Sequence, residues 1–246
     1  MVKRDDLFEV AGVCGGKARA CLGLVRRAPK PRLGLVTAGA AASPQVNIVA
    51  HIGAELGLPV RAHVPKTKVL SPEIAAAKAR GAEIIQHAPG YNTVIVARCR
   101  ADARARGWIE IPFGMECPEA VIQTWQQAAL LPWGQFKRIV MPCGSGMSLA
   151  GVLWALKESG CRTPVIAVRV GADPSKRLDE YAPDEWRAMV QIVDSGTGYK
   201  MAAETQWNGI TLDPHYEAKA ARFVQPDDLF WIVGLRQTVK RSLTTE

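Results

Sequence analysis

The apolar positions of this chain follow two alternating patterns, one typical of buried strands and one typical of helices. Short runs rich in Val, Ile and Leu end at Gly or Pro, and longer segments with helical spacing come between them. Because strands that alternate with helices form parallel sheets covered by helices, the pattern predicts an α/β fold. We expect strands over 33–37, 59–64, 81–85, 108–112, 136–141, 164–170, 190–193 and 229–233, and helices over 45–56, 71–80, 93–107, 118–130, 148–157, 182–189 and 214–222.

The composition is that of a globular protein, since 48% of the 246 residues are hydrophobic and 22% are charged. The first six residues are too charged for a secretory signal, and no apolar run approaches the roughly 18 residues that a membrane span needs. We therefore expect a cytoplasmic protein without a membrane partner. The six cysteines and four histidines lack the spacing of zinc or redox motifs, so we expect reduced thiols and no metal.

Positive charge is in excess, with a formal net charge of +8 and a pI near 9.3. Such a balance favours a polyanionic partner, and nucleic acid is one candidate. The alternative is an arginine-rich surface that only meets water, and no helix-turn-helix, RNP or zinc-finger pattern decides between them. The basic clusters are Arg26, Arg27, Lys30 and Arg32, then Arg98, Arg100, Arg104 and Arg106, then Lys137 with Arg138, and Lys240 with Arg241.

A lysine follows two glycines near the start of the chain, in Gly15-Gly16-Lys17. A lysine amine becomes a good nucleophile where desolvation or a neighbouring cation lowers its pKa, and Arg19 is close in sequence. The glycines leave room for a bulky ligand beside the amine. The segment fits a covalent ligand site or an ordinary loop. It does not fit a Walker loop, because Ala18 stands where Ser or Thr is required.

A glycine-rich turn joins a strand to a helix further on, in Gly144-Ser145-Gly146-Met147-Ser148. The free N–H groups and the positive end of the helix dipole would meet at one point, which is the arrangement that binds a phosphate. The dinucleotide motif GxGxxG is not met, because Leu149 stands at its last position. The alternative is a tight turn with nothing bound.

A third turn, over 37–45, also ends a strand and opens a helix. Ser43 and Gln45 in this turn are candidates to bind a substrate carboxylate together with backbone N–H groups. The alternative is a packing turn made of small residues.

Several motifs in consistent order carry a family resemblance over about residues 2–234. They are 2–7 (VKRDDL), 15–17 (GGK), Ser43 before 54–59 (AELGLP), 111–114 (IPFG), 144–151 (GSGMSLAG), and 209–214 (GITLDP) with Tyr216 and Lys219. In these motifs the chain resembles the tryptophan synthase β-like, or fold type II, pyridoxal phosphate enzymes. Within them it is similar to the group of 1-aminocyclopropane-1-carboxylate deaminase and D-cysteine desulfhydrase.

The resemblance implies roles for particular residues. Lys17 would bind the pyridoxal 5'-phosphate cofactor as a Schiff base and move the Cα proton, and Ser43 would contact the substrate near its carboxylate. Tyr199 resembles an active-site tyrosine and is a candidate general acid or base. The turn Gly144-Ser145-Gly146-Met147-Ser148 would hold the cofactor phosphate, and Asn208 stands where the group often has an acidic contact to the cofactor ring.

The chain departs from the family pattern at several places. The family usually has an Asn between the glycine pair and the lysine, and an Asn where Pro44 stands here. Asn208 replaces an acidic residue, and 233–235 (VGL) replaces a Thr-Gly-Gly segment. The chain also begins almost at the VKRDDL motif, so the resemblance implies a truncated N-terminus and a more open site. These departures leave the cofactor ring's contacts and the reaction undecided.

The fold that the resemblance implies is two doubly wound, Rossmann-like domains. The larger would span 1–32 and 111–246 and bind the cofactor, and the smaller would span 33–110; a homodimer is the family expectation. The leading function is a lyase acting at Cα of an α-amino acid group, specifically decarboxylation of an amino-acid-modified thymine in bacteriophage DNA. The alternatives are a deaminase or desulfhydrase of a small free amino acid, and a catalytically silent binding protein with this fold.

Overall fold

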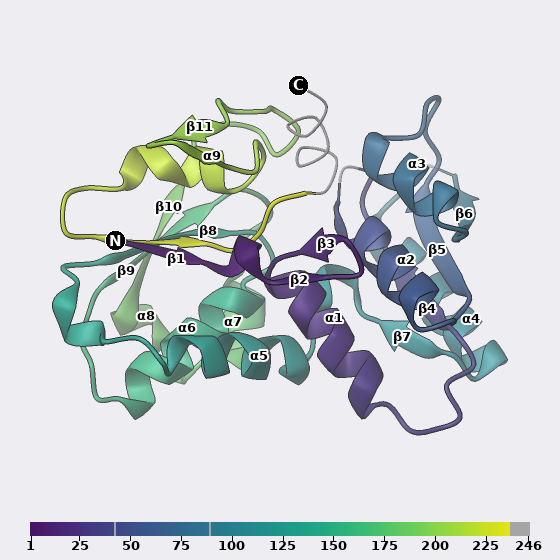
Figure 1. Cartoon of the computed structure of the whole chain (residues 1–246), viewed down its shortest axis with the longest axis horizontal. Helices are drawn as coiled ribbons and strands as arrows, with labels where there is room; N and C mark the ends of the chain where they lie inside the picture. Colours follow the sequence, from purple (N-terminus) through teal and green to yellow (C-terminus); the bar gives the residue numbers. More distant parts are fainter. Residues whose placement is uncertain (42, 89, 237–246) are drawn as a thin grey trace. The chain divides into compact units, whose positions relative to one another are not determined.

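The computed structural model describes residues 1–41, 43–88 and 90–236, which divide into two compact units (Figure 1). Residues 1–8 and 116–235 form the larger unit, and residues 9–115 with Arg236 form the smaller one. Helix α1 (Gly16–Arg27) packs against α2 (Gln45–Glu55), which groups residues 9–32 with the smaller unit. The sequence analysis placed that segment in the larger domain, and the functional division into domains stays a prediction.

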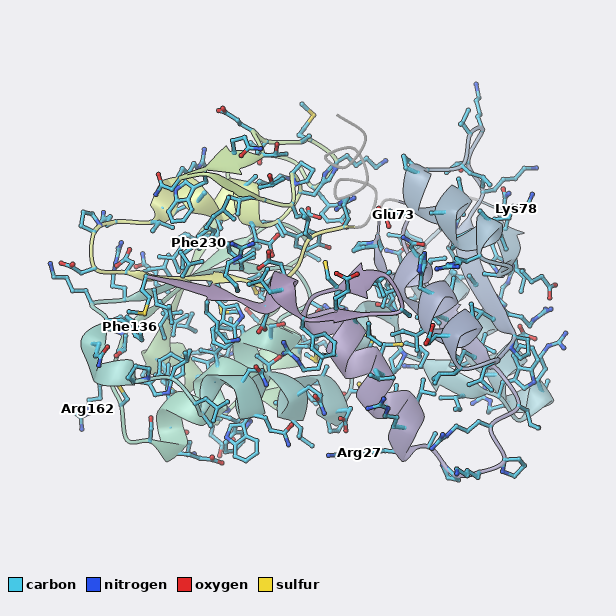
Figure 2. All side chains as sticks on the ribbon, in the orientation of Figure 1. Arg27, Glu73, Lys78, Phe136, Arg162 and Phe230 are labelled. Atoms are coloured by element: carbon cyan, nitrogen blue, oxygen red, sulfur yellow. The ribbon has the colours of Figure 1, made fainter. Side chains whose placement is uncertain are left out.

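The larger unit is built on a sheet of five parallel strands in the order β1-β13-β8-β9-β10. Strands β8 and β13 consist entirely of buried apolar residues. Phe230, labelled in Figure 2, lies on β13 and is fully buried. Such continuous apolar runs are typical of strands covered on both faces. The strands are β1 (Val2–Arg4), β8 (Ile139–Cys143), β9 (Val165–Arg169), β10 (Val190–Asp194) and β13 (Leu229–Ile232).

Helices cover both faces of this sheet (Figure 1). On one face, α5 packs closely on α6 because Gly151 carries no side chain; a Cβ there would lie 2.6 Å from the Thr124 Cβ. On the other face, α9 and a small hairpin bury Leu212 and Ala220 against Phe230. The helices are α5 (Pro118–Ala128), α6 (Met147–Glu158), α7 (Ser175–Tyr181), α8 (Trp186–Met189) and α9 (Glu217–Ala220), and the hairpin strands are β11 (Gln206–Trp207) and β12 (Ile210–Thr211).

The smaller unit has a sheet of four parallel strands in the order β6-β5-β4-β7. Helices α2 and α3 pack on one face and α4 on the other. A two-stranded hairpin of β2 (Glu9–Val10) and β3 (Val13–Cys14) leads into α1. The sheet strands are β4 (Leu35–Ala38), β5 (Val60–Pro65), β6 (Glu83–His87) and β7 (Ile109–Ile111), and the remaining helices are α3 (Pro72–Ala79) and α4 (Asn92–Arg106).

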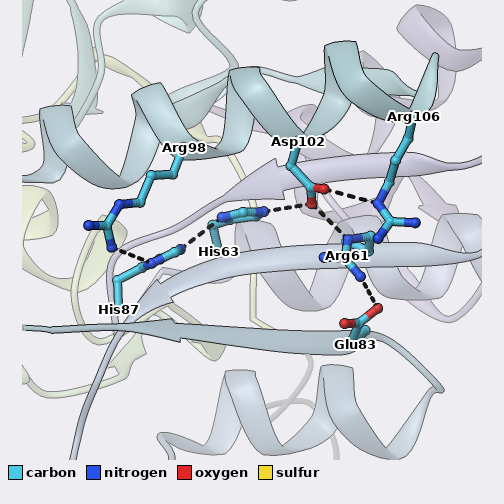
Figure 3. Close-up of polar contacts among 7 residues, drawn as sticks. All are labelled: Arg61, His63, Glu83, His87, Arg98, Asp102 and Arg106. Atoms are coloured by element: carbon cyan, nitrogen blue, oxygen red, sulfur yellow. Dashed lines mark hydrogen bonds and ion pairs between the residues drawn. The ribbon is translucent and has the colours of Figure 1, made fainter.

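A chain of polar contacts joins α4 to β5 and β6 (Figure 3). His63 is buried, with its Nε2 2.9 Å from Asp102 Oδ2 and its Nδ1 2.8 Å from His87 Nε2. Arg98 reaches the other nitrogen of His87 at 2.9 Å. Asp102 also accepts hydrogen bonds from Arg61 at 2.7 Å and Arg106 at 2.9 Å. Burial disfavours charge on Asp102, but these three partners hold its pKa well below the usual range.

The α/β class predicted from the sequence is confirmed, and most helices and strands lie within a few residues of the expected ranges. The helix expected over 182–189 is wrong. Ala182 is extended because it precedes Pro183, so the chain forms α7 before this point and only the short α8 after it. The six cysteines are unbonded, and all except Cys161 are buried. Among the described helices, none combines the length and apolar character that crossing a bilayer requires.

Candidate active site

Lys17 lies in the first turn of α1 in the smaller unit, directly after two buried glycines. Gly15 precedes the helix with a φ of 98°, which residues with a side chain rarely adopt. The Gly15 carbonyl accepts the Arg19 N–H at 3.1 Å, and this bond begins the helix. Lys17 itself is half-buried. The two glycines therefore hold the lysine at the start of a packed helix, with no Cβ on the preceding backbone.

The turn between β4 and α2, also in the smaller unit, contains Ser43 and Gln45. The Ser43 hydroxyl oxygen accepts the Gln45 backbone N–H at 3.3 Å. The buried Gln45 amide nitrogen donates to the Thr37 hydroxyl at 3.1 Å and to the Pro112 carbonyl at 2.7 Å. Its amide oxygen is buried and has no hydrogen-bond partner among the described residues. Gln45 thus fixes the turn to the ends of β4 and β7 and keeps one acceptor for a donor from outside.

The glycine-rich turn lies at the carboxyl end of β8 in the larger unit. Gly146 has a φ of 90° and precedes α6. The Gly146 carbonyl accepts a hydrogen bond from the Ala150 N–H at 2.9 Å, at the start of this helix. The N–H groups of Met147 and Ser148 in the first turn have no carbonyl within the helix to accept them. A Cβ on Gly144 would lie 2.9 Å from the ring of Tyr216, so only glycine fits beside that ring. The turn offers donors and a helix dipole to an anion, as the sequence predicted.

Two tyrosine hydroxyls lie together in the same unit. Tyr199 Oη and Tyr216 Oη are 3.0 Å apart, and the two rings meet edge to face with centroids 6.0 Å apart. The buried Lys219 donates to the carbonyls of Gly198 at 2.8 Å and Tyr199 at 3.3 Å, which fixes this segment. The sequence analysis singled out Tyr199 alone. Tyr216 connects it to the glycine-rich turn, because its ring lies against Gly144.

Glu217 is a buried carboxyl that the sequence analysis missed. Its Oε1 accepts the backbone N–H groups of Val233 at 3.0 Å and Gly234 at 3.2 Å, just beyond the end of β13. Its Oε2 is buried and has no partner among the described residues. Burial raises the pKa of Glu217 well above its usual value, and the nearby charge of Asp213 raises it further. In its neutral form this carboxyl can give a proton to a basic ligand atom.

Asn208 is exposed in the two-residue turn between β11 and β12. It has a φ of 46°, and Gly209 after it has a φ of 75°. These values are typical of the Asn-Gly turn that closes tight hairpins. Turn geometry explains this Asn, and no described contact supports its assignment to the cofactor ring, which stays a prediction.

Comparisons with known proteins show which family this chain belongs to. The sequence profile of a family described as pyridoxal-phosphate dependent enzyme matches residues 2–212. The chain belongs to the pyridoxal-phosphate dependent enzyme family. Its cofactor is pyridoxal phosphate, as the sequence predicted. No curated protein sequence matches the chain.

Solved structures show the same fold over nearly the whole chain. An ACC deaminase homologue is 21% identical, with a TM-score of 0.79, over 99% of this chain and 87% of that chain. Threonine deaminase isoform 2 from Solanum lycopersicum, in its processed form, is 15% identical, with a TM-score of 0.66 and coverage of 97% and 81%. Diaminopropionate ammonia lyase from Escherichia coli is 14% identical, with a TM-score of 0.63 and coverage of 98% and 78%. The predicted fold type II is confirmed.

The residues present fit pyridoxal phosphate. The cofactor has an aldehyde, a phosphate and a basic ring nitrogen. In the larger unit, the turn over 144–148 offers backbone donors to a phosphate, and the unpartnered Oε2 of Glu217 is the kind of group that a ring nitrogen needs. In the smaller unit, Lys17 offers an amine to the aldehyde.

The only sequence signal for Glu217 was an acidic residue near the start of a predicted helix. Such a residue usually stabilises the helix dipole at an exposed helix end.

Proposed function

We propose that this protein is a pyridoxal-phosphate dependent lyase that acts at Cα of an α-amino acid group. One observation carries the proposal, namely the buried Glu217 carboxyl with one oxygen held and one oxygen without a partner. Glu217 would give its proton to the cofactor's ring nitrogen and remain beside it as a carboxylate. The bound cofactor supplies an electron sink that takes up the electron pair left at Cα. A positively charged ring nitrogen makes that sink stronger.

The other site residues would hold the substrate and move protons. Lys17 would carry the cofactor on its Nζ and exchange a proton at Cα. Ser43, with the free amide oxygen of Gln45, would orient the substrate's polar groups. The hydroxyl pair of Tyr199 and Tyr216 would pass a proton to or from the substrate, since the two oxygens are 3.0 Å apart.

We propose further that the amino acid group is attached to a thymine base in DNA and is decarboxylated there. In this reaction the bond from Cα to the carboxylate breaks, carbon dioxide leaves, and a proton takes its place on Cα. The net charge of +8 supports a polyanionic substrate. A bacteriophage DNA-modification role, a cytoplasmic location and a homodimer belong to the same proposal.

A deaminase or desulfhydrase of a free amino acid is the second candidate. The paired hydroxyls of Tyr199 and Tyr216 favour it, because elimination of a β-substituent or opening of a small ring requires a proton donor close to the substrate. This candidate predicts release of ammonia and a 2-oxo acid, with rates that depend little on salt.

One assay separates the two candidates. The protein, loaded with pyridoxal phosphate, is given free amino acids in one series and, in another, DNA with a thymine that carries an amino acid whose α-carboxylate is free. Carbon dioxide and ammonia are measured in both series. Decarboxylation of a DNA-bound amino acid predicts carbon dioxide from the modified DNA alone. Ammonia from free amino acids, with no carbon dioxide from the DNA, would overturn the proposal in favour of the second candidate.

A further inference from the structure

The excess positive charge belongs almost entirely to the smaller unit. Residues 9–115 contain 15 Lys and Arg against 6 Asp and Glu, a net charge of +9. Residues 1–8 and 116–235 contain 13 against 16, a net charge of −3. A polyanion would therefore be attracted to the smaller unit.

Most arginines on and beside α4 already have carboxylate partners. Arg61 pairs with Glu83 and Asp102, Arg106 pairs with Asp102, and Arg100 pairs with Glu110 at 3.2 Å. A cation whose charge is balanced by a neighbouring carboxylate contributes little to the attraction of a phosphate. The basic cluster on α4 is therefore a weaker candidate than the sequence suggested.

A second basic group lies at the carboxyl edge of the small sheet, in the loop over 66–71 that joins β5 to α3 (Figure 1). Lys66 and Lys68 are both exposed. They are the only charged residues in the segments 39–44, 66–71, 88–91 and 112, which follow the four strands at this edge. The turn with Ser43 lies at the same edge, because β4 and β5 are parallel neighbours.

Both ends of this loop are anchored. The Lys66 N–H donates to the His87 carbonyl at 2.7 Å. At the other end, the Ser71 side chain caps α3 and donates its hydroxyl hydrogen to the Ala41 carbonyl, in the turn that holds Ser43. Between these anchors Val69 is 82% exposed. The loop therefore presents two lysines and one apolar side chain at a fixed place beside the turn that holds Ser43.

We propose that the loop over 66–71 is a DNA-backbone contact that positions the modified base at the turn with Ser43. Lys66 and Lys68 bind phosphates, and Val69 contacts a sugar or the face of an unstacked base. The inference rests on the proposed function, since it assigns that function's substrate to a surface. It makes the loop a determinant of substrate binding and leaves cofactor binding to other residues.

The test compares two double variants with equal charge changes on the same unit. K66Q/K68Q removes the two loop lysines. R26Q/K30Q removes two exposed cations near the amino edge of the same sheet, beside an open hollow of about 570 Å³ that Lys30, Arg32, Leu56 and Leu58 help to line. Binding of a short unmodified DNA, single-stranded and duplex, is measured by fluorescence anisotropy at increasing salt. Cofactor absorbance and urea unfolding confirm that both variants fold and bind the cofactor.

The slope of log affinity against log salt is negative, and for K66Q/K68Q we expect its magnitude to fall by about two, since each phosphate contact contributes about one. R26Q/K30Q keeps a slope close to that of the wild type. Equal slopes for the two variants, or no salt-dependent DNA binding by the wild type, would overturn the inference.

Turnover of DNA that carries the amino-acid-modified thymine, with its α-carboxylate free, distinguishes this failure from failure of the proposed function. If the wild type and both variants release carbon dioxide from the modified DNA with the same KM, the function stands and the loop assignment falls. If K66Q/K68Q loses the salt-dependent DNA binding but the wild type releases no carbon dioxide from the modified DNA, the loop is a DNA contact and the proposed reaction is wrong.

Discussion

The carboxyl of Glu217 is buried just beyond β13, where water cannot stabilise a negative charge. Its two backbone donors favour the charged form, but burial and Asp213 favour the neutral form more strongly. A buried carboxyl oxygen without a hydrogen-bond partner costs free energy, and a ligand atom that bonds to it removes that cost. Among the described residues of the larger unit, this carboxyl gives the clearest reason to expect a basic ligand atom.

A Glu217→Gln variant tests the protonation state without cofactor. The folded-state pKa of Glu217 is raised, so its neutral form stabilises the fold fully below the unfolded pKa of about 4.3, and this contribution is lost as pH rises toward the folded pKa. Glutamine stays neutral at every pH. We expect the variant to gain stability relative to the wild-type apoprotein as pH rises from acid to mildly alkaline values, measured by urea unfolding. A difference that does not change with pH would show that the carboxyl is not perturbed.

The sequence predicted site roles for residues with simple motif chemistry and gave none to residues whose chemistry depends on burial. Lys17 and the turn at 144–148 stand beside glycines, which the sequence shows directly. The role of Glu217 depends on the backbone donors after β13, which lie 16 and 17 residues away in the chain. Tyr216 likewise becomes a candidate site residue only because its ring lies against Gly144 in the folded chain.

At the scale of elements, the strand–turn–helix over 139–158 forms the turn that we propose as the phosphate site. The turn needs glycine at Gly146 because φ is 90° there and because a Cβ would lie 3.1 Å from the Pro174 Cβ. At the far end of α6, Gly160 has a φ of 66° and open space around it. Substitutions at these two glycines therefore separate two costs, that of a left-handed backbone, which both share, and that of crowding, which applies only at Gly146.

We expect Gly146→Ala to destabilise the protein more than Gly160→Ala does. The left-handed backbone costs an alanine about 1–2 kcal/mol at either position, and crowding against Pro174 adds to it only at Gly146. Urea unfolding without cofactor measures the strain, and cofactor titration measures the site. Gly146→Ala should also weaken pyridoxal phosphate binding, whereas Gly160→Ala should not. Equal effects of the two variants on cofactor binding would contradict a phosphate site at this turn.

The polar chain beneath α4 contains two imidazoles in hydrogen-bond contact, and we expect it to make the stability of the smaller unit depend on pH (Figure 3). If His63 donates from Nε2 to the Asp102 carboxylate, its Nδ1 accepts from His87, and His87 Nδ1 accepts from Arg98. The His87 imidazole is then neutral, and a further proton on its Nδ1 would break the hydrogen bond from Arg98. Burial, the neighbouring His63 and the charge of Arg98 lower the pKa of His87.

A lowered folded-state pKa means that His87 contributes stability above its unfolded pKa of about 6.5, and that the contribution is lost as pH falls through the folded value. We expect the stability advantage of the wild type over His87→Gln to shrink as pH falls from mildly alkaline to mildly acid. Urea unfolding at a series of pH values measures it. An advantage that stays constant would contradict the proposed arrangement of protons.

Periodicity predicted a helix where the apolar spacing is regular, as in α5, and continuous apolar runs predicted the buried strands, as in β8. It failed at Pro183, because this proline makes Ala182 extended and ends the helix. It also did not predict β1, a three-residue strand whose residues are half-buried. The pairing of β1 with β13 joins opposite ends of the chain, and a local pattern does not contain that information.

At the scale of the whole molecule, charge is divided unequally between two α/β units. The smaller unit carries the excess of positive charge together with Lys17 and the turn with Ser43. The larger unit carries the glycine-rich turn proposed to bind the phosphate and the buried Glu217. The net charge was readable from the sequence, but its assignment to one unit required the fold.

The central claim is that Lys17 bears the cofactor, and its most direct test locates the attachment. The protein is loaded with pyridoxal phosphate, the carbon–nitrogen double bond to the lysine is reduced with borohydride, and the digested peptides are analysed by mass spectrometry. Lys78, exposed on α3 of the same unit, provides the control through Lys78→Ala (Figure 2). We predict the cofactor adduct on Lys17 in the wild type and in Lys78→Ala, and its loss in Lys17→Ala. An adduct on another lysine, or none in the wild type, would contradict the assignment.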